Sequence, residues 1–168
     1  PQSHHMHKPF RLGLTRDFLK PDGSLGFGDI GLDVLAENSQ IEREFLPDYG
    51  QELPAEVANQ FDALLVLAPR VTATTLENCD RLAIVARFGV GHDNVDVPAC
   101  TRNNVLLTIT PAGVRRPVAV SALTLLLALS HKLLAKDRMT REGRWHEKLD
   151  QMGVGLTGRT FGLIGLGN

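Results

Sequence analysis

The sequence predicts an α/β protein whose first part is a flavodoxin-like, doubly wound parallel sheet of five strands. Short apolar runs alternate with helical stretches from residue 10 to residue 110. One run, ALLVLAP at residues 63–69, is unbroken and ends at a proline, as is typical of a strand buried on both faces. Strands that alternate with helices form right-handed βαβ units, which place the strands in parallel under helices on both faces.

Each element follows from its own stretch of sequence. Strands are expected over residues 10–15, 41–47, 63–69, 82–89 and 105–111, where the apolar runs lie. Helices are expected between them over residues 28–39, 54–62, 72–80 and 96–104. The first of these helices would place Ile30, Leu32, Val34 and Leu35 on one apolar face, with Asp29 near its start. The third begins with threonines, which are suited to capping.

The pattern changes after residue 111, which we take as the end of a first domain over residues 8–111. A long helix is expected over residues 116–141, apolar almost all round from 118 to 129 and basic at its end. Its uncharged run, residues 117–131, is shorter than the ~20 residues of a bilayer span, which favours a buried helix. Residues 159–168 are expected to form a strand and turn that begin a second, incomplete α/β unit within residues 112–168.

Composition narrows the function classes. The 168 residues are 43% hydrophobic and 22% charged, as in soluble globular proteins. The net charge of −1 and the lack of a long basic run give nucleic-acid binding no electrostatic support. Cys79 and Cys100 are expected as buried thiols of a reduced, cytoplasmic protein, not as metal ligands. Residues 1–7, with three histidines around Met6, are interpreted as a remnant of a purification tag.

A glycine-rich turn follows the expected fourth strand in ARFGVGHDNVD, residues 86–96. Doubly wound sheets bind ligands at the carboxyl ends of their strands, and glycines let backbone N–H groups approach an anion. The amides of Val90 and Gly91 could therefore hold a carboxylate, and a turn without a ligand is the alternative. His92, beside them, is interpreted as a histidine of a surface loop.

Two further stretches carry candidate anion-binding residues. The sequence ends on GLIGLGN, whose Gly165, Leu166, Gly167 and Asn168 match the first half of a dinucleotide-binding fingerprint. The third glycine and the ribose-binding acid of that fingerprint would follow Asn168. Arg115 and Arg116 are expected in a loop before a helix that starts near Pro117. They could meet an acid or a phosphate, or be solvated.

Taken in order, these segments resemble the D-isomer-specific 2-hydroxyacid dehydrogenase family. The segments that carry the resemblance are LAIVARFGVGHDNVDVPACTRNNVLLTITP, RRPVAVSALTLLLALSHKLLAKDRMTREGRW and LTGRTFGLIGLGN. The resemblance implies a flavodoxin-like substrate domain and a Rossmann domain, with NAD or NADP exchanging hydride with C2 of a 2-hydroxy or 2-keto acid. It implies that Val90 and Gly91 bind the substrate carboxylate and that the loop from Gly165 binds the cofactor. It also implies that the long helix takes part in the contacts of a homodimer.

The sequence departs from the family in two respects. Members often carry Val-Ala-Glu-His where this chain has Val118, Ala119, Val120 and Ser121, so the acid and the histidine are absent. The catalytic arginine, acid and histidine of the family would all follow Asn168. The chain alone is therefore expected to be inactive, because nothing in it supplies the proton or holds the developing oxyanion.

Other functions use the same fold. A corepressor-like module that binds NAD and acts through protein partners is the alternative that these residues leave open. A phosphoacceptor receiver would need an acid at the carboxyl end of the third strand, where Leu67, Ala68 and Pro69 stand, with Asp62 at the start of that strand. The motifs leave open which 2-hydroxy acid is the substrate and whether the cofactor is NAD or NADP.

Overall fold

The computed structural model describes residues 8–165 of the chain. The chain divides into two compact units, the first ending at Pro111 and the second beginning at Ala112. The expected tag remnant, residues 1–7, lies outside the described residues.

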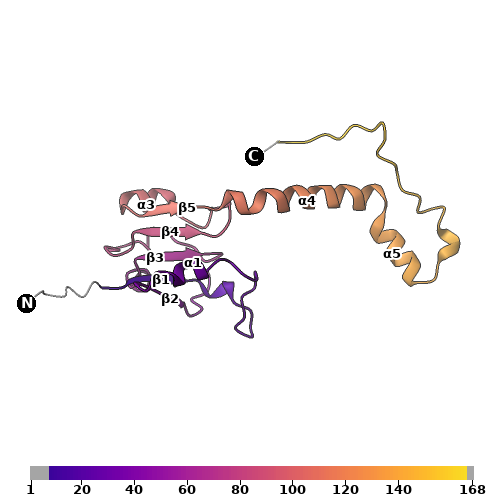
Figure 1. The fold of residues 1–168 in the computed structure, drawn as a ribbon. Coiled ribbons are helices and arrows are strands. Elements are labelled where there is room, and N and C mark those ends of the chain that lie inside the picture. Colours follow the sequence, from indigo (N-terminus) through magenta and orange to yellow (C-terminus); the bar gives the residue numbers. More distant parts are fainter. Residues whose placement is uncertain (1–7, 166–168) are drawn as a thin grey trace, which may run out of the picture. The chain divides into compact units, whose positions relative to one another are not determined.

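The first unit is built on a parallel sheet of five strands (Figure 1). The strands lie in the order β2-β1-β3-β4-β5, which is the flavodoxin-like order. All four pairings are parallel. The α/β class and the five-stranded parallel sheet are thus confirmed. Their bounds are β1 (Phe10–Leu14), β2 (Ile41–Phe45), β3 (Ala63–Val66), β4 (Ile84–Arg87) and β5 (Leu106–Thr108).

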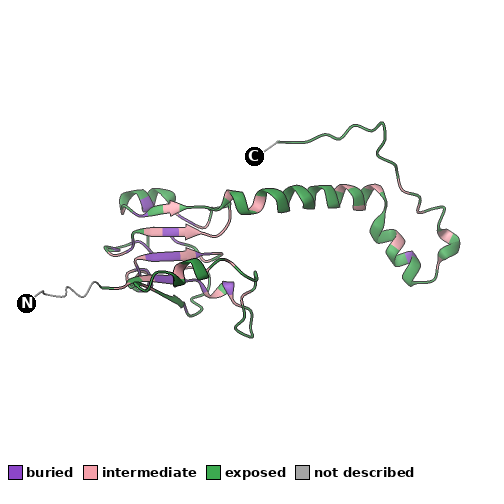
Figure 2. Ribbon diagram, in the orientation of Figure 1, coloured by how far each residue is buried: buried purple, intermediate pink, exposed green. Residues whose placement is uncertain are grey.

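Strand β3 is buried on both faces of the sheet, as its unbroken apolar run predicts (Figure 2). Its alternate side chains enter two separate apolar clusters, because successive residues of a strand point to opposite faces. Leu64 and Val66 belong to the larger cluster. Ala63 belongs to the smaller one, which also holds Leu12 and Leu14 of β1 and is covered by Leu32 and Leu35.

The helices of this unit are shorter than the sequence predicts. They are α1 (Asp33–Ala36), α2 (Ala55–Ala58) and α3 (Val97–Arg102). The helix expected from residue 28 cannot begin there, because Gly31 has φ +77° and its N–H binds the Asp29 carboxylate in a local turn. Val34 consequently faces solvent, whereas Leu32 and Leu35 cover the sheet.

The helix expected over residues 72–80 was a wrong prediction, because this segment forms a series of turns. Thr72 and Thr75 exchange bonds between their side chains and each other's backbone N–H groups, an alternative to helical bonding that threonine offers. Asn78, with φ +53°, lies in the left-handed region and stops helical continuation.

The long helix expected over residues 116–141 is two helices, α4 (Pro111–Ser130) and α5 (Leu133–Arg141). The break lies at Lys132, whose φ of 51° and ψ of 42° are left-handed. Helix α4 begins at Pro111, five residues before the predicted start, so Arg115 and Arg116 lie on the helix and not in a loop. Pro117 is inside α4, where it has no N–H to bond to the preceding turn.

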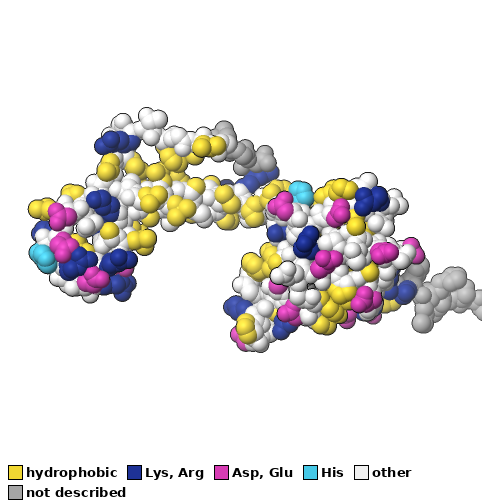
Figure 3. All heavy atoms as spheres, turned by 180° about the vertical axis from the view of Figure 1, so that it is seen from behind, with side chains coloured by type: hydrophobic (Ala, Val, Ile, Leu, Met, Phe, Trp, Pro, Cys, Tyr) yellow, Lys and Arg dark blue, Asp and Glu magenta, His cyan; other side chains and the backbone are white. Residues whose placement is uncertain are grey.

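The prediction that the long helix is buried was wrong for the described chain, since α4 has no buried residue (Figure 2). Hydrophobic side chains run along it (Figure 3), and Leu125 and Leu129 keep 63% and 78% of their surface exposed. The helix has 20 residues, and an 18-residue window of it has a mean hydropathy of 1.5, so by length and composition alone it could span a bilayer. Core helices of soluble proteins meet the same criterion.

The strand expected over residues 159–168 does not form within residues 159–165, which are exposed and belong to no helix or strand. A strand requires a hydrogen-bonded neighbour, and no described segment pairs with this one. Gly165 has φ +81°, a conformation suited to a glycine turn. Leu166, Gly167 and Asn168 lie outside the described residues.

Candidate functional site

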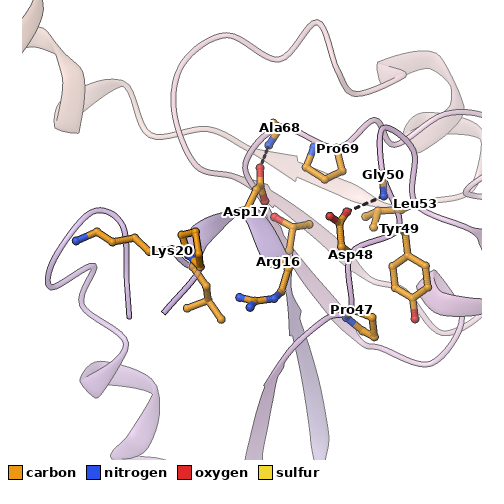
Figure 4. Close-up of a pocket in the computed structure, with 13 residues that line it drawn as sticks. Arg16, Asp17, Lys20, Pro47, Asp48, Tyr49, Gly50, Leu53, Ala68 and Pro69 are labelled. Carbon is orange, nitrogen blue, oxygen red and sulfur yellow. Dashed lines mark hydrogen bonds between the residues drawn. The ribbon is translucent and has the colours of Figure 1, made fainter. Parts of the chain in front are cut away.

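Two cavities open at the carboxyl edge of the sheet, where doubly wound proteins bind ligands. One, of about 380 Å³, lies among the segments that follow β1, β2 and β3 (Figure 4). The other, of about 310 Å³, lies between the segments that follow β3 and β4. Ala68 lines both cavities, so they adjoin along the loop after β3. The second cavity is lined by Leu67, Ala68, Arg87, Gly91, Asp93 and Asn94.

The turn after β4 is fixed at its first residue. The Gly89 N–H donates to the Thr110 hydroxyl over 2.7 Å, and the Thr110 N–H donates to the Gly89 carbonyl over 2.8 Å. Gly89 has φ +137°, which favours glycine, and a Cβ there would overlap the Arg87 guanidinium. The backbone therefore favours glycine at position 89, and any other residue would also have to displace the flexible Arg87 side chain.

The end of the same turn is fixed through Asn94 and Val71. The Val71 N–H donates to the Asn94 carbonyl, and the Asp96 N–H donates to the Val71 carbonyl, both over 2.8 Å. The Asn94 amide donates to the Pro69 carbonyl over 3.0 Å and lies 3.4 Å from two other carbonyls of the loop after β3. The Asp96 carboxylate caps α3 at the Ala99 N–H. The two loops that border the second cavity are thus tied together.

Between these fixed points, the N–H groups of Val90 and Gly91 donate no hydrogen bond to any residue within 8–165. Gly91 lines the second cavity, and a Cβ built on it would meet nothing within 4 Å. His92 is exposed, with its Nδ1 3.2 Å from the Val90 carbonyl oxygen. The sequence-predicted pair therefore stands in an accessible, anchored turn with two free donors.

Two arginines that the sequence reading missed also belong to this edge. Among the described residues, Arg16 Nη1 and Arg87 Nε are the buried side-chain nitrogens or oxygens that lack a hydrogen-bond partner. Arg16 lines the larger cavity and Arg87 the smaller one. The available sequence signal was their position directly after β1 and at the end of β4, where side chains reach the ligand edge.

The other candidates lie in the second unit. Arg115 and Arg116 are exposed on α4, as are Val120 and Ser121. Of the four expected cofactor-binding residues, the described one is Gly165, whose positive φ fits the tight turn of a dinucleotide-binding loop.

At the opposite, amino edge of the sheet, the charged side chains are paired with each other. The Asp62 carboxylate accepts from the Arg11 N–H at 2.7 Å and from two Arg81 nitrogens at 2.7 and 3.1 Å. The Arg81 hydrogen bond is the main cause that lowers the pKa of Asp62.

Burial raises the pKa of the Cys79 and Cys100 thiols, so both stay protonated near neutral pH.

Fold and site together define an α/β protein with a flavodoxin-like sheet and two adjoining cavities at its carboxyl edge. Residues 27–149 match the family described as D-isomer specific 2-hydroxyacid dehydrogenase, catalytic domain. This match covers well over half of the chain, so the chain belongs to that family.

Named relatives agree with this assignment. The chain is 37% identical over 148 residues to a glyoxylate reductase of Thermococcus gammatolerans, covering 82% of this chain and 43% of the relative. It is 36% identical over 138 residues to a D-3-phosphoglycerate dehydrogenase of Archaeoglobus fulgidus, covering 82% of this chain and 24% of the relative. The chain therefore spans less than half the length of each of these two proteins.

Solved structures share the fold. An NAD-dependent formate dehydrogenase from Staphylococcus aureus, solved in complex with NAD, gives a TM-score of 0.67 at 20% identity, covering 86% of this chain and 46% of that chain. A D-2-hydroxyisocaproate dehydrogenase gives 0.66 at 20% identity, covering 88% of this chain and 43% of that chain. At this level of identity the likeness establishes the fold alone.

Proposed function

We propose that this chain forms the substrate-binding half of an NAD(P)-dependent oxidoreductase of 2-hydroxy acids. The observation that carries the proposal is the pair of unpartnered N–H groups at Val90 and Gly91, beside a cavity at the ligand edge of the sheet. Successive backbone N–H groups form a concave donor site for an anion. They would hold the C1 carboxylate of the substrate by charge-assisted hydrogen bonds.

The residues around this pair have positioning roles. Gly89 and Thr110 fix where the turn leaves β4, and Asn94 holds the loop that forms the opposite wall. Arg87 places a cation beside the same cavity. A substrate anchored by its carboxylate keeps C2 at a constant position, and a bound nicotinamide would supply or accept the hydride there.

The proposed reaction is the interconversion of a small 2-keto acid and its D-2-hydroxy acid. The identity to glyoxylate reductases supports a small substrate, and NAD complexes among the structural neighbours support a nicotinamide cofactor. Proton transfer and stabilisation of the C2 oxyanion need an arginine, an acid and a histidine from residues after Asn168. The 168-residue chain alone is accordingly proposed to be inactive.

Pyruvate binding tests the carboxylate site without requiring turnover. In a titration of the ¹⁵N-labelled chain, pyruvate should shift the amide signals of Val90 and Gly91 more than those of other residues. In parallel, NADH absorbance with glyoxylate should show no turnover by the 168-residue chain. Turnover would overturn the assignment of catalysis to later residues, and unmoved Val90 and Gly91 signals would overturn the carboxylate site.

We further propose that two copies associate through α4 to form a homodimer. The helix is apolar nearly all round and exposes Val118, Val120, Leu123, Leu125, Leu127 and Leu129. Monomeric soluble proteins rarely expose an apolar surface of this extent, which supports a second copy as its cover.

A further inference from the structure

The larger cavity, next to the proposed carboxylate site, holds an arginine that no described residue satisfies. Arg16 Nη1 is buried and has no hydrogen-bond partner. No ion pair within residues 8–165 includes Arg16. A buried donor on a charged group that lacks a partner is costly, so such groups normally find one. Arg16 also lines the cavity, and its side chain forms no hydrogen bond with residues 8–165, so its guanidinium is available to an acceptor that enters the cavity.

The cavity's own carboxylates are committed elsewhere. The Asp17 carboxylate accepts from the Ala68 N–H, and the Asp48 carboxylate accepts from the Gly50 N–H, each over 2.8 Å (Figure 4). Neither forms an ion pair with Arg16, although both line the same cavity. Lys20 also lines the cavity, with its ammonium directed away from Arg16 (Figure 4). Arg16 is therefore a cation that no described residue neutralises in this cavity.

The backbone around Arg16 is held in place before any ligand arrives. The buried Thr15 donates its N–H to Leu65 over 3.1 Å and accepts from the Leu67 N–H over 3.2 Å. Phe18, on the other side, is fully buried, and its N–H donates to the Thr15 carbonyl. Because the flanking residues are fixed, Arg16 would lose little backbone freedom on binding.

We infer that the larger cavity binds the carboxylate or phosphate group of a small molecule, with the Arg16 guanidinium as its main contact. A guanidinium presents a planar fork of donors that matches either group in a bidentate geometry. A volume of about 380 Å³ falls within the usual range of small-molecule sites. The two cavities adjoin at Ala68, so the group could belong to either of two sources.

One source is a second acidic group on the substrate held at Val90 and Gly91, and this version rests on the proposed function. The other is a separate anion that binds independently of the substrate. Three probes distinguish the two sources: inorganic phosphate, pyruvate, and 2-ketoglutarate, which is a 2-keto acid with a second carboxylate. Each is titrated into the ¹⁵N-labelled 168-residue chain.

Phosphate is expected to shift the amide signals of residues 15–20. Arg16→Met should weaken phosphate binding by about tenfold or more. Arg102→Met is the matched control, because Arg102 is exposed on α3 and lines neither cavity, and it should change the affinity by less than about twofold. Preserved β-strand signals establish that each variant is folded, and Arg16→Gln replaces Arg16→Met if the latter is not.

If the second acidic group is on the substrate, 2-ketoglutarate shifts residues 15–20 and 90–94 together and binds more tightly than pyruvate. Arg16→Met then removes that advantage. If the anion is separate, phosphate and pyruvate bind at the same time without affecting each other. The inference is overturned if phosphate leaves residues 15–20 unchanged or binds a folded Arg16 variant as well as the wild type. Failure of pyruvate at Val90 and Gly91 would refute only the proposed function.

Discussion

Substitution by alanine should have different effects at two glycines of one turn, on stability at Gly89 and on ligand binding at Gly91. Gly89→Ala places a side chain on a residue with φ +137° and against the Arg87 guanidinium. Gly91→Ala places it where φ is not left-handed and nothing lies within 4 Å. We therefore expect Gly89→Ala to destabilise the first unit, and Gly91→Ala to leave its stability intact while obstructing the cavity.

The magnitude for Gly89→Ala comes mainly from the backbone. Forcing a non-glycine residue into this region costs about 1–3 kcal/mol. The Arg87 side chain, which also donates to the Phe88 carbonyl, must move away at a further cost of about 0.5–1.5 kcal/mol. The two costs together give an expected loss of about 1.5–4.5 kcal/mol. Gly91→Ala should stay within about 0.5 kcal/mol, as is usual for exposed substitutions free of strain.

Urea unfolding measures the first quantity, followed through the amide signals of β1 and β3 so that only the first unit is reported. The pyruvate titration measures the second, and Gly91→Ala should weaken binding about tenfold, the equivalent of 1.4 kcal/mol. The reasoning is refuted if both variants lose the same stability. It is equally refuted if Gly91→Ala binds pyruvate as the wild type does.

Three other predictions concern the rest of the chain. Asp62→Asn should lower the free energy of unfolding by about 1–3 kcal/mol at neutral pH, since it removes a carboxylate that Arg81 and a backbone N–H bind. Because the folded pKa of Asp62 is lowered from 3.8, its stabilisation is present above that value and lost as pH falls through the folded pKa. Urea unfolding at neutral pH and below pH 3.8 should show the two proteins converging, and a constant difference would contradict the ion pair. Leu125→Lys should weaken self-association at least about tenfold in sedimentation velocity, and an unchanged monomer fraction would exclude α4 as the interface. Cys79 and Cys100 should react with a thiol reagent at least about tenfold more slowly in the folded chain than in urea, since burial raises the pKa of both, and equal rates would show that they are accessible.

The sequence predicted the sheet better than the helices because strand signals were local and continuous. An apolar run such as residues 63–69 has few alternatives to a doubly covered strand. The helices failed where a single residue took a left-handed conformation, at Gly31, Asn78 and Lys132. Asparagine and lysine at such positions look compatible with a helix in sequence. Their φ values are decided by surrounding contacts that a pattern of apolar residues does not encode.

The glycine turn was found because its chemistry is carried by the backbone, which glycine spacing reveals. The two arginines were missed because their significance lies in the absence of a hydrogen-bond partner. Such an absence is visible in the structure but not in the sequence. Asn94 was missed as well, since its role is to bind carbonyls about 25 residues earlier in the chain. Residues 159–165 show the converse: their pattern is that of a strand, and they form none because pairing is a property of two segments.

The two edges of the sheet differ in whether their charged side chains have partners. This difference indicates at which edge ligands are expected to bind. At the amino edge, Asp62 and Arg81 satisfy each other, and Arg81 also donates to a backbone carbonyl. At the carboxyl edge, Arg16 and Arg87 each line a cavity and keep a buried nitrogen that has no partner within residues 8–165. Burial without pairing costs stability, and the same fold shows at its other edge that it can pair such groups. The unpaired arginines are therefore best explained by anionic groups that arrive with ligands. By this argument, filling either cavity with a bound anion should stabilise the first unit.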